Sequence, residues 1–424
     1  MIEVRSGPLR RDVIVRVPGS KSYTHRLLVA AALARGRSAI RGALRSEDTL
    51  ATLDALKKLG VGVDDDGDSI FLEGRAGRFA ACSEPIFLAN SGTSMRLLGS
   101  LAALGEGRYV LDGCERMRER PMRPLLEALC AIGIEAKALN GDGCPPLELR
   151  SGKRTGGSAR VDCGTSSQYL SSLLMIAPCL EKGLSLEVSR GPVSRPYIDM
   201  TLETMGAFGI SHEREGYDFF RVAGGQGYRS GEHRVEADAS QAGYFWAAGA
   251  VTGARVKVEG VLASSLQGDA RLARVFERMG CRVERESDGI AVRGPAIAAV
   301  DEDMGDMPDM VPTLAVVAAF AHGTTRMRNV SHLRAKESDR LAAIIGELAK
   351  MGIEAGVESR DGEEELFVVG GEPHGARIET YRDHRIAMSF AVAGLAAPGT
   401  TIDGEACVGK SFPDFWSVFG GLYA

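Results

Sequence analysis

The sequence has few of the features that mark metalloproteins, secreted proteins and membrane proteins. Its eight cysteines form no CxxC pair, and its seven histidines show no HxH or HExxH spacing. We therefore expect no metal site and free thiols in a reducing compartment. No stretch approaches the roughly 20 apolar residues of a membrane span, and the first residues show no apolar run typical of a signal peptide. These patterns favour a cytoplasmic protein without a membrane partner.

The chain also carries little net charge. The chain has 51 lysines and arginines against 56 aspartates and glutamates, for a net charge of −5, so nothing indicates a nucleic-acid partner. The composition is 44% hydrophobic and 25% charged, which is ordinary for a globular protein. A length of 424 residues favours two or more domains.

One phrase recurs, in which a helical stretch ends in a glycine and a strand follows. Its glycines are Gly60, Gly133, Gly206, Gly280 and Gly352. Their spacing stays near ~73 residues, longer than the ~20–50-residue periods of solenoid repeats. Each glycine fits a left-handed helix cap, and Asp-Gly pairs at 66–67, 288–289 and 361–362 predict hairpin turns. Because a second helix and strand precede each phrase, the predicted unit is strand, helix, strand, helix, hairpin.

The chain holds six such units, and the sixth ends after its second helix, near residues 413–419. We expect residues 1–12, which include spare strand sequence, to complete it. The predicted domains are therefore 13–230, with three repeats, and 231–424 plus 1–12, with the other three. Alternating strands and helices place the chain in the α/β class.

Short polar clusters open the first helix of each unit. They are PGSKS, NSGTS, GTSSQ, ADASQ, MPDMV and YRDHR. Ser, Asp and Asn cap helices whatever the function, but a helix start also favours anions. Basic residues gather near these starts: Lys21, Arg26, Arg96, Arg120, Lys336, Arg340, Arg385 and Lys410. If they converge, they indicate a small ligand with several negative groups, because Arg and Lys neutralise phosphate and carboxylate without a metal.

Several segments together resemble the 5-enolpyruvylshikimate-3-phosphate synthase family, in family order and over nearly the whole chain. They are PGSKSYTHR, NSGTSMR, RMRERP, SSQYL, SRPYID, PDMVPTLA, LRAKESDRL, RDHRIAM and GKSFPDF. The resemblance implies a two-domain α/β prism, an inside-out α/β barrel of six βαβαββ repeats that closes over a cleft. It also implies a monomer without a cofactor. The implied reaction transfers the enolpyruvyl group of phosphoenolpyruvate to the 5-hydroxyl of shikimate 3-phosphate and releases phosphate, in the shikimate pathway of aromatic amino acid biosynthesis.

The resemblance carries site residues over one by one. The implied phosphoenolpyruvate contacts are Lys21, Gly92, Arg120, Gln168, Arg340, Arg385 and Lys410. The implied shikimate 3-phosphate contacts are Lys21, Ser22, Arg26, Ser166, Ser167, Gln168, Ser194, Tyr197, Asp309 and Lys336. Asp309 and Glu337 match the acidic pair implicated in proton transfer. Glu337 is our first choice for proton exchange at the methylene, Asp309 for the attacking hydroxyl, and Lys21 could share the acid role.

Two positions depart from the family pattern. His332 stands where the family often has Asn, which affects one phosphate or hydroxyl contact, although imidazole can still donate. Cys114 lies in a loop where the sister family, the UDP-N-acetylglucosamine enolpyruvyl transferases, carries a reactive cysteine. That sister family is the alternative assignment, but it has Lys-Asn where this chain has Lys21-Ser22. We interpret Cys114 as incidental.

Two remote alternatives complete the sequence-based hypotheses. Residues 404–411, GEACVGKS, fit the P-loop pattern G-x4-G-K-[ST], but a P-loop needs a strand before it and a long helix after it. A non-enzymatic repeat scaffold would explain the period, but not acidic residues placed among basic motifs.

Overall fold

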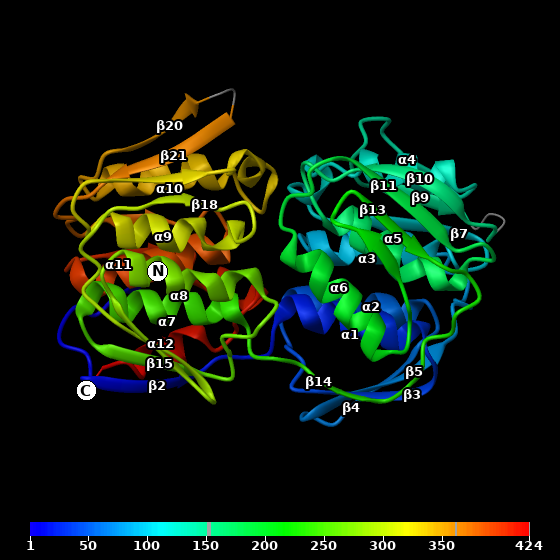
Figure 1. The fold of residues 1–424 in the computed structure, drawn as a ribbon, viewed down its shortest axis with the longest axis horizontal. Helices are drawn as coiled ribbons and strands as arrows, with labels where there is room; N and C mark the ends of the chain where they lie inside the picture. Colours follow the sequence, from blue (N-terminus) through cyan, green and yellow to red (C-terminus); the bar gives the residue numbers. More distant parts are fainter. Residues whose placement is uncertain (151–153, 361–362, 424) are drawn as a thin grey trace. The chain divides into compact units, whose positions relative to one another are not determined.

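The structure is a computed structural model that describes residues 1–150, 154–360 and 363–423. The chain divides into two compact units (Figure 1). One is Gly19–Val235, and the other joins Met1–Pro18 to Glu236–Ala424. We call them the 19–235 unit and the 236–424 unit. In the described residues, no helix is both long and apolar enough to span a bilayer.

One repeat shows how each unit is built. Strand β6 (Ile86–Phe87) runs into helix α3 (Gly92–Ala102) and returns as β7 (Arg108–Asp112), which is parallel to β6. Helix α4 (Arg123–Ala131) then leads to the hairpin of β8 (Glu135–Ala138) and β9 (Leu147–Arg150). Because β9 pairs antiparallel with β7, the sheet order is β6-β7-β9-β8. This is the predicted βαβαββ unit.

The other two repeats of the 19–235 unit follow the same plan, with sheets β14-β3-β5-β4 and β10-β11-β13-β12. The first comprises α1 (Lys21–Leu33), β3 (Arg35–Arg41), α2 (Glu47–Lys58), β4 (Gly62–Asp65), β5 (Ser69–Arg75) and β14 (Glu232–Arg234). The other comprises β10 (Gly157–Asp162), α5 (Gln168–Ile176), β11 (Leu184–Arg190), α6 (Pro196–Ala207), β12 (Glu213–Glu215) and β13 (Phe219–Val222).

The 236–424 unit has two further four-stranded sheets, β16-β17-β15-β2 and β18-β19-β21-β20. The first repeat comprises β2 (Asp12–Arg16), α7 (Ala239–Thr252), β15 (Arg255–Glu259), α8 (Leu272–Arg278), β16 (Arg282–Glu286) and β17 (Gly289–Arg293). The next comprises β18 (Asp301–Asp303), α9 (Val311–Ala318), β19 (Thr324–Arg328), α10 (Arg340–Lys350), β20 (Ala355–Arg360) and β21 (Glu363–Val369).

The sixth repeat is shorter and is completed by the start of the chain. It comprises β22 (Arg377–Glu379), α11 (His384–Ala396), β23 (Thr401–Asp403) and α12 (Phe415–Gly420). In its sheet, β1 (Ile2–Glu3) pairs antiparallel with β23, with Ile2 opposite Ile402. The expected hairpin is therefore replaced by a single N-terminal strand.

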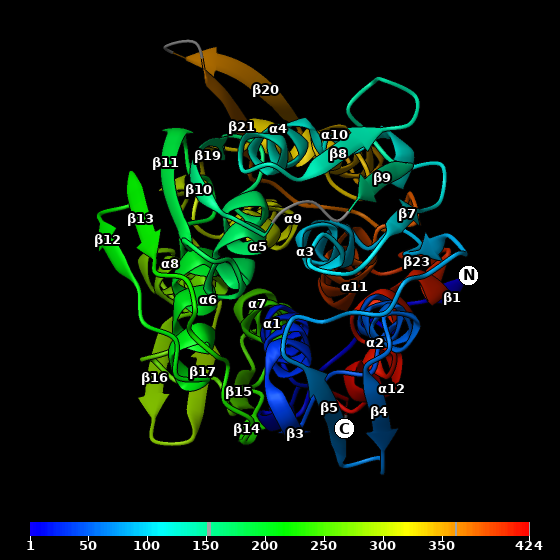
Figure 2. The ribbon, with the colours of Figure 1, turned by 90° about the vertical axis from the view of Figure 1, so that its right-hand side faces the viewer.

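The first helix of each repeat forms the core of its unit. Nearly every residue of α1, α3, α7 and α11 is buried, because these helices are rich in Ala, Leu, Val and Phe on all sides. In Figure 2, α1, α3 and α5 are seen nearly end-on, with strands of their three sheets around them. Their polar starts are therefore held by a rigid apolar bundle.

One sequence prediction about the repeats needs correction. We expected Gly206 to cap its helix in the left-handed conformation, but α6 continues through it, and Gly209 takes the positive φ of 84° instead. Gly60, Gly133, Gly280 and Gly352 do have positive φ. The turn predicted at 361–362 lies outside the described residues.

The limits of the units also differ from the predicted limits at 12 and 230. Strand β2 pairs in parallel with β15 of the 236–424 unit, and β14 pairs in parallel with β3 of the 19–235 unit. We had assigned β2 to the N-terminal domain and β14 to the C-terminal domain, and the structure places each in the other unit. The chain passes from one unit to the other at residues 18–19 and again at 235–236.

Candidate active site

Arg26 is the most deeply buried cation at the polar starts of the 19–235 unit, with 1% of its surface exposed. Its Nε donates to Thr201 Oγ1 at 2.8 Å, and its Nη1 and Nη2 donate to the carbonyls of Ser22 and Tyr197, each at 2.9 Å. Burial lowers the pKa of Arg26 to about 10. Among the described residues it has no carboxylate partner, so a charged group sits in the fold with neutral acceptors alone.

Gly92 and Arg120 are in close contact at the start of α3. A Cβ atom added to Gly92 would lie 2.5 Å from Arg120 Nη2, so only a glycine leaves room for the guanidinium in this position. Arg120, 3% exposed, follows the 3₁₀ helix η1 (Met117–Glu119), and its Nη1 donates to the Asn90 carbonyl at 3.1 Å. The structure therefore joins two of the predicted residues directly.

Gln168, the first residue of α5, links the second and third helix starts. Its Nε2 donates to Thr93 Oγ1 and its Oε1 accepts from Arg96 Nη1, both at 2.9 Å. Its backbone N–H donates to Ser166 Oγ at 3.3 Å. The amide is thus held on both sides, and Arg96 is a further buried arginine that donates to a neutral oxygen.

The predicted phosphate-binding serines lie together. Ser167 Oγ donates to the Ser194 carbonyl at 3.3 Å, and Ser194 has a positive φ of 58°, which is uncommon for a residue with a Cβ. Two residues later α6 begins with Pro196 and Tyr197, and the Arg26 guanidinium lies 5.7 Å from the Tyr197 ring centre. Ser166 adjoins this group through Gln168.

Lys21 opens α1 and is mostly buried. Its Nζ lies 3.1 Å from Asp48 Oδ2, an acid that is itself 3% exposed. The Asp48 carbonyl accepts from Ser94 Oγ at 3.2 Å, which places Lys21 near the start of α3. Sequence reasoning missed Asp48, because a single Asp in the first turn of a helix is what capping alone predicts.

Arg340 is the centre of a charged cluster in the 236–424 unit. The guanidinium, 1% exposed, donates to three carboxylates at 2.8 Å each: Nη1 to Asp309, Nη2 to Glu337 and Nε to Asp383. The 3₁₀ helix η4 (Pro308–Met310) supplies Asp309, and Asp383 caps α11 by accepting from the Arg385 backbone N–H. One arginine therefore fixes three acids from three segments.

Arg385 supplies a second guanidinium to Asp309. Its Nη2 donates to Asp309 Oδ2 at 2.8 Å, and Lys336 Nζ lies 3.9 Å from Asp309 Oδ1. Burial alone would raise the pKa of Asp309, but Arg385, Lys336 and Arg340 outweigh it and hold the pKa well below its usual range. Asp309 is consequently ionised at neutral pH.

His332 and Lys410 complete the predicted residues of this unit. Burial, with the charge of Lys336 beside it, lowers the pKa of His332 to about 3, so the imidazole is neutral. Within the described residues its Nε2 is buried without a hydrogen-bond partner. Lys410 is buried at the end of the 3₁₀ helix η6 (Glu405–Lys410), which packs against α11.

The P-loop alternative does not survive this geometry. A P-loop wraps phosphates between a strand and a long helix, whereas residues 405–410 form η6 and Ser411 follows it in irregular backbone. The helix after it, α12, has six residues.

Cys114 lies half-buried against the core, near Arg118. The positive charge of Arg118 is already paired with Asp112 at 2.6 Å.

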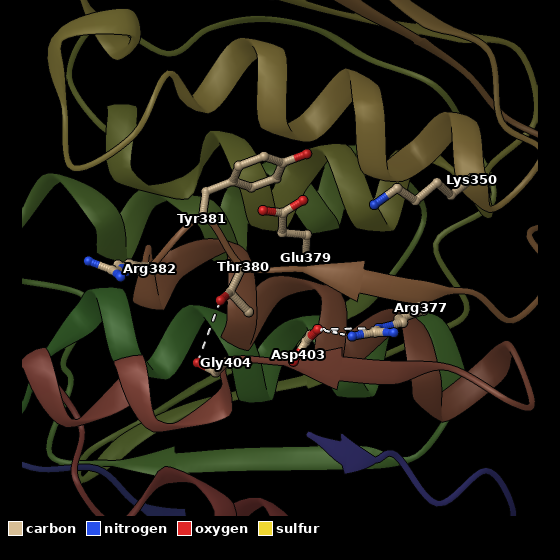
Figure 3. A pocket seen from close by; sticks show the side chains of 8 residues that line it. All are labelled: Lys350, Arg377, Glu379, Thr380, Tyr381, Arg382, Asp403 and Gly404. Atoms are coloured by element: carbon tan, nitrogen blue, oxygen red, sulfur yellow. Dashed lines mark hydrogen bonds and ion pairs between the residues drawn. The ribbon is translucent and has the colours of Figure 1, made fainter.

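A pocket of about 360 Å³ lies beside the charged cluster around Arg340, and none of the acids bound to Arg340 lines it (Figure 3). It is lined by Lys350, Arg377, Glu379, Thr380, Tyr381, Arg382, Asp403 and Gly404. Tyr381 and Arg382 both have positive φ, 52° and 56°. The Tyr381 hydroxyl donates at 2.7 Å to Glu347, a fully buried acid. This contact anchors the strained turn that presents Asp383 and Arg385.

Comparisons with known proteins agree on one family. The family model described as EPSP synthase (3-phosphoshikimate 1-carboxyvinyltransferase) matches residues 6–419. A 3-phosphoshikimate 1-carboxyvinyltransferase of Syntrophobacter fumaroxidans is 46% identical over 409 residues, covering 95% of each chain. One of Methanoculleus marisnigri is 43% identical, covering 98% of each.

Solved structures show the same fold. The EPSP synthase of Acinetobacter baumannii matches with a TM-score of 0.81 and 27% identity, covering 99% of this chain and 98% of that one. The enolpyruvyl transferase NikO of Streptomyces tendae matches with a TM-score of 0.78 and 20% identity, covering 99% and 96%. The α/β two-domain fold expected from the sequence is therefore confirmed.

Proposed function

The chain belongs to the EPSP synthase family, and we propose how its residues carry out the family's reaction. The enzyme transfers the enolpyruvyl group of phosphoenolpyruvate to shikimate 3-phosphate in the shikimate pathway. The 5-hydroxyl loses its proton as its oxygen bonds to C2 of phosphoenolpyruvate, and the C3 methylene of phosphoenolpyruvate gains a proton. The resulting tetrahedral intermediate then loses phosphate from C2 and a proton from C3, which restores the double bond.

The observation that carries the binding proposal is the buried positive charge of Arg26. A buried ion without a counter-ion costs several kcal/mol, and the Arg26 guanidinium donates to a hydroxyl and two carbonyls. A substrate carboxylate would supply the missing charge. We assign Arg26 and Ser22 to the shikimate carboxylate, and Ser166, Ser167, Ser194 and Tyr197 to the rest of shikimate 3-phosphate. Gln168 and Lys21 would contact both substrates.

Phosphoenolpyruvate binding is assigned to residues of both units. Arg120 beside Gly92 offers one guanidinium, and Arg340, Arg385 and Lys410 offer three more cations from the 236–424 unit. The family resemblance supports this set, as does the bidentate geometry in which guanidinium groups bind carboxylate and phosphate. Cations aimed at the leaving phosphate also stabilise its charge as the C–O bond breaks.

Asp309 and Glu337 are assigned to proton transfer. Asp309 is ionised and accepts from both Arg340 and Arg385. An incoming anion competes for the same two guanidinium groups. Because its negative charge offsets their positive charge, the pKa of Asp309 would rise toward that of an effective base. Asp309, with Lys336, would then orient and deprotonate the attacking hydroxyl. Glu337, held by Nη2 of Arg340, would exchange protons with the methylene, with Lys21 able to share the acid role.

The acceptor tests this function most simply. Inorganic phosphate released from phosphoenolpyruvate is measured with shikimate 3-phosphate, with UDP-N-acetylglucosamine and with no acceptor. We expect steady release with shikimate 3-phosphate alone. Phosphate release that depends on UDP-N-acetylglucosamine instead would show that the chain has the activity of the sister family.

We further propose that the enzyme works as a monomer in the cytoplasm. The described residues contain no disulfide among the eight cysteines, which suits a reducing compartment. Sedimentation equilibrium should give a mass near the 45.1 kDa of one chain. A dimer mass at enzymatic concentrations would contradict the proposal.

A further inference from the structure

Asp269 is a buried acid that none of the assigned roles uses. It lies on the 3₁₀ helix η3 (Gly268–Arg271) and is 2% exposed. Its Oδ2 accepts a short hydrogen bond from Ser240 Oγ. In the described residues its Oδ1 is buried with no hydrogen-bond partner. An unpartnered buried carboxylate oxygen is costly, so its position calls for a reason.

Ser240 connects Asp269 to the charged cluster. Arg385 Nη2 lies 3.5 Å from Ser240 Oγ and 2.8 Å from Asp309 Oδ2, and Arg385 Nη1 lies 3.3 Å from the Tyr244 hydroxyl. The guanidinium is therefore held between Asp309 and two hydroxyls of α7. Asp269 is on the far side of one of these hydroxyls and fixes its orientation.

We propose that Asp269 is a positioning residue that acts through Ser240 to hold Arg385 in the orientation that receives phosphoenolpyruvate. The proposal rests on the proposed function, in which Arg385 contacts that substrate. It adds a residue that touches neither substrate and that no motif in the sequence distinguishes.

The protonation state of Asp269 matters because of the charges around it. It faces Asp309 of η4, Arg385 of α11, and Asp238 and Ser240 at the start of α7. The first turn of α8 adds apolar Leu272 and Ala273, and on its own element Arg271 pairs with Asp306 at the surface. Burial, reinforced by the charge of Asp309, raises the pKa of Asp269 to about 7.

These charges determine how ionisation of Asp269 affects the binding of phosphoenolpyruvate. Below about pH 7 Asp269 is neutral, and Arg385 keeps its positive charge available for an anion. Above that pH Asp269 ionises and adds a negative charge behind Arg385, which disfavours a negatively charged substrate. Binding of phosphoenolpyruvate should therefore be linked to retention of the Asp269 proton. An asparagine, which cannot ionise, should remove that linkage.

The test compares the wild type with Asp269→Asn across pH. The KM for phosphoenolpyruvate and kcat are measured between about pH 6 and pH 8.5. The protonation of phosphoenolpyruvate itself changes equally for the wild type and the variant. The ratio of their KM values therefore reports only the ionisation of groups on the enzyme. We expect a ratio of wild type to variant near 1 at pH 6 that rises about tenfold by pH 8.5, with little change in the ratio of kcat. A ratio that stays constant would overturn the proposal.

Further variants separate the possible failures. Asp301→Asn, at an exposed acid of the same unit, is the matched control and should leave the ratio constant. If Arg385→Lys leaves the KM for phosphoenolpyruvate unchanged, the proposed role of Arg385 fails. If Arg385→Lys raises it but the pH ratio is flat, the role of Asp269 alone fails. Should Asp269→Asn not fold, Ser240→Ala decides: it should raise this KM several-fold, and no effect would refute the link.

Discussion

Arg26 and Arg340 are both buried guanidinium groups, but their charges are met in opposite ways. Arg340 contacts three carboxylates, and these raise its pKa against the effect of burial. Arg26 contacts neutral oxygens, and burial lowers its pKa. Arg340 therefore organises three acids, whereas the charge of Arg26 is not balanced by an acid of the described residues. This difference is why we assign Arg26 to an anionic group of the substrate.

His332 gives a prediction at the scale of one residue. Its pKa of about 3 lies below the ~6.5 of an unfolded histidine. Between these values the unfolded chain binds a proton that the folded protein does not, so stability is lost as the pH falls from about 6.5 toward 3. His332→Asn should remove this loss and gain about 2 kcal/mol relative to the wild type between pH 8 and pH 5. Urea unfolding at both pH values measures it.

The control for this comparison is His322→Asn, which removes an exposed histidine from the same unit. A stability difference between His332→Asn and the wild type that is equal at both pH values would show that the buried imidazole does not resist protonation.

At the scale of single elements, helix starts carry most of the candidate site. The pattern of polar clusters before apolar helices was visible in the sequence, because capping residues precede buried helices. That pattern correctly placed Lys21, Gly92, Gln168 and Arg385 in the first turns of their helices. Asp48 and Asp269 were missed because their contacts come from other elements. Lone acids in ordinary first turns or loops give no local signal of such partners.

Gly92 gives a prediction at this scale. A Cβ at this position would lie 2.5 Å from Arg120 Nη2, so Gly92→Ala should displace the guanidinium and raise the KM for phosphoenolpyruvate about tenfold or more. The fold should tolerate the change, because Ala is a better helix residue than Gly by roughly 0.5–1 kcal/mol. Steady-state kinetics and thermal unfolding measure the two effects.

Gly99→Ala in the same helix is the matched control. Its Cβ would lie 3.5 Å from Leu125, an ordinary contact, so this variant should have normal kinetics. Equal KM values in the two variants would mean that Arg120 is not positioned by the space at Gly92.

At the scale of the whole molecule, the repeat period predicted six βαβαββ units and their grouping by threes. It did not predict which sheet receives the connecting strands. The sequences of β2 and β14 fit an edge position in either unit, since strand pairing is decided by distant partners rather than local pattern. The exchange of β2 and β14 is therefore a property of tertiary structure that the sequence pattern does not contain.

The exchange predicts which fragment can fold. The fragment 19–235 keeps β14, whose residues pair with Ala39, Ile40 and Arg41 of β3, and the buried Val235. The fragment 19–230 loses both. We expect 19–235 to unfold cooperatively and 19–230 to melt about 5 °C lower or more. Circular dichroism during heating measures this, and equal melting temperatures would argue against a structural role for β14.

The central claim is that groups from both units serve one reaction. Phosphate release from phosphoenolpyruvate, dependent on shikimate 3-phosphate, tests it in two single variants: Lys21→Met in the 19–235 unit and Glu337→Gln in the 236–424 unit. With folding verified by thermal unfolding, each substitution should lower kcat by ~10²-fold or more if the group transfers a proton or stabilises the transition state. A near-normal rate in both variants would contradict the claim.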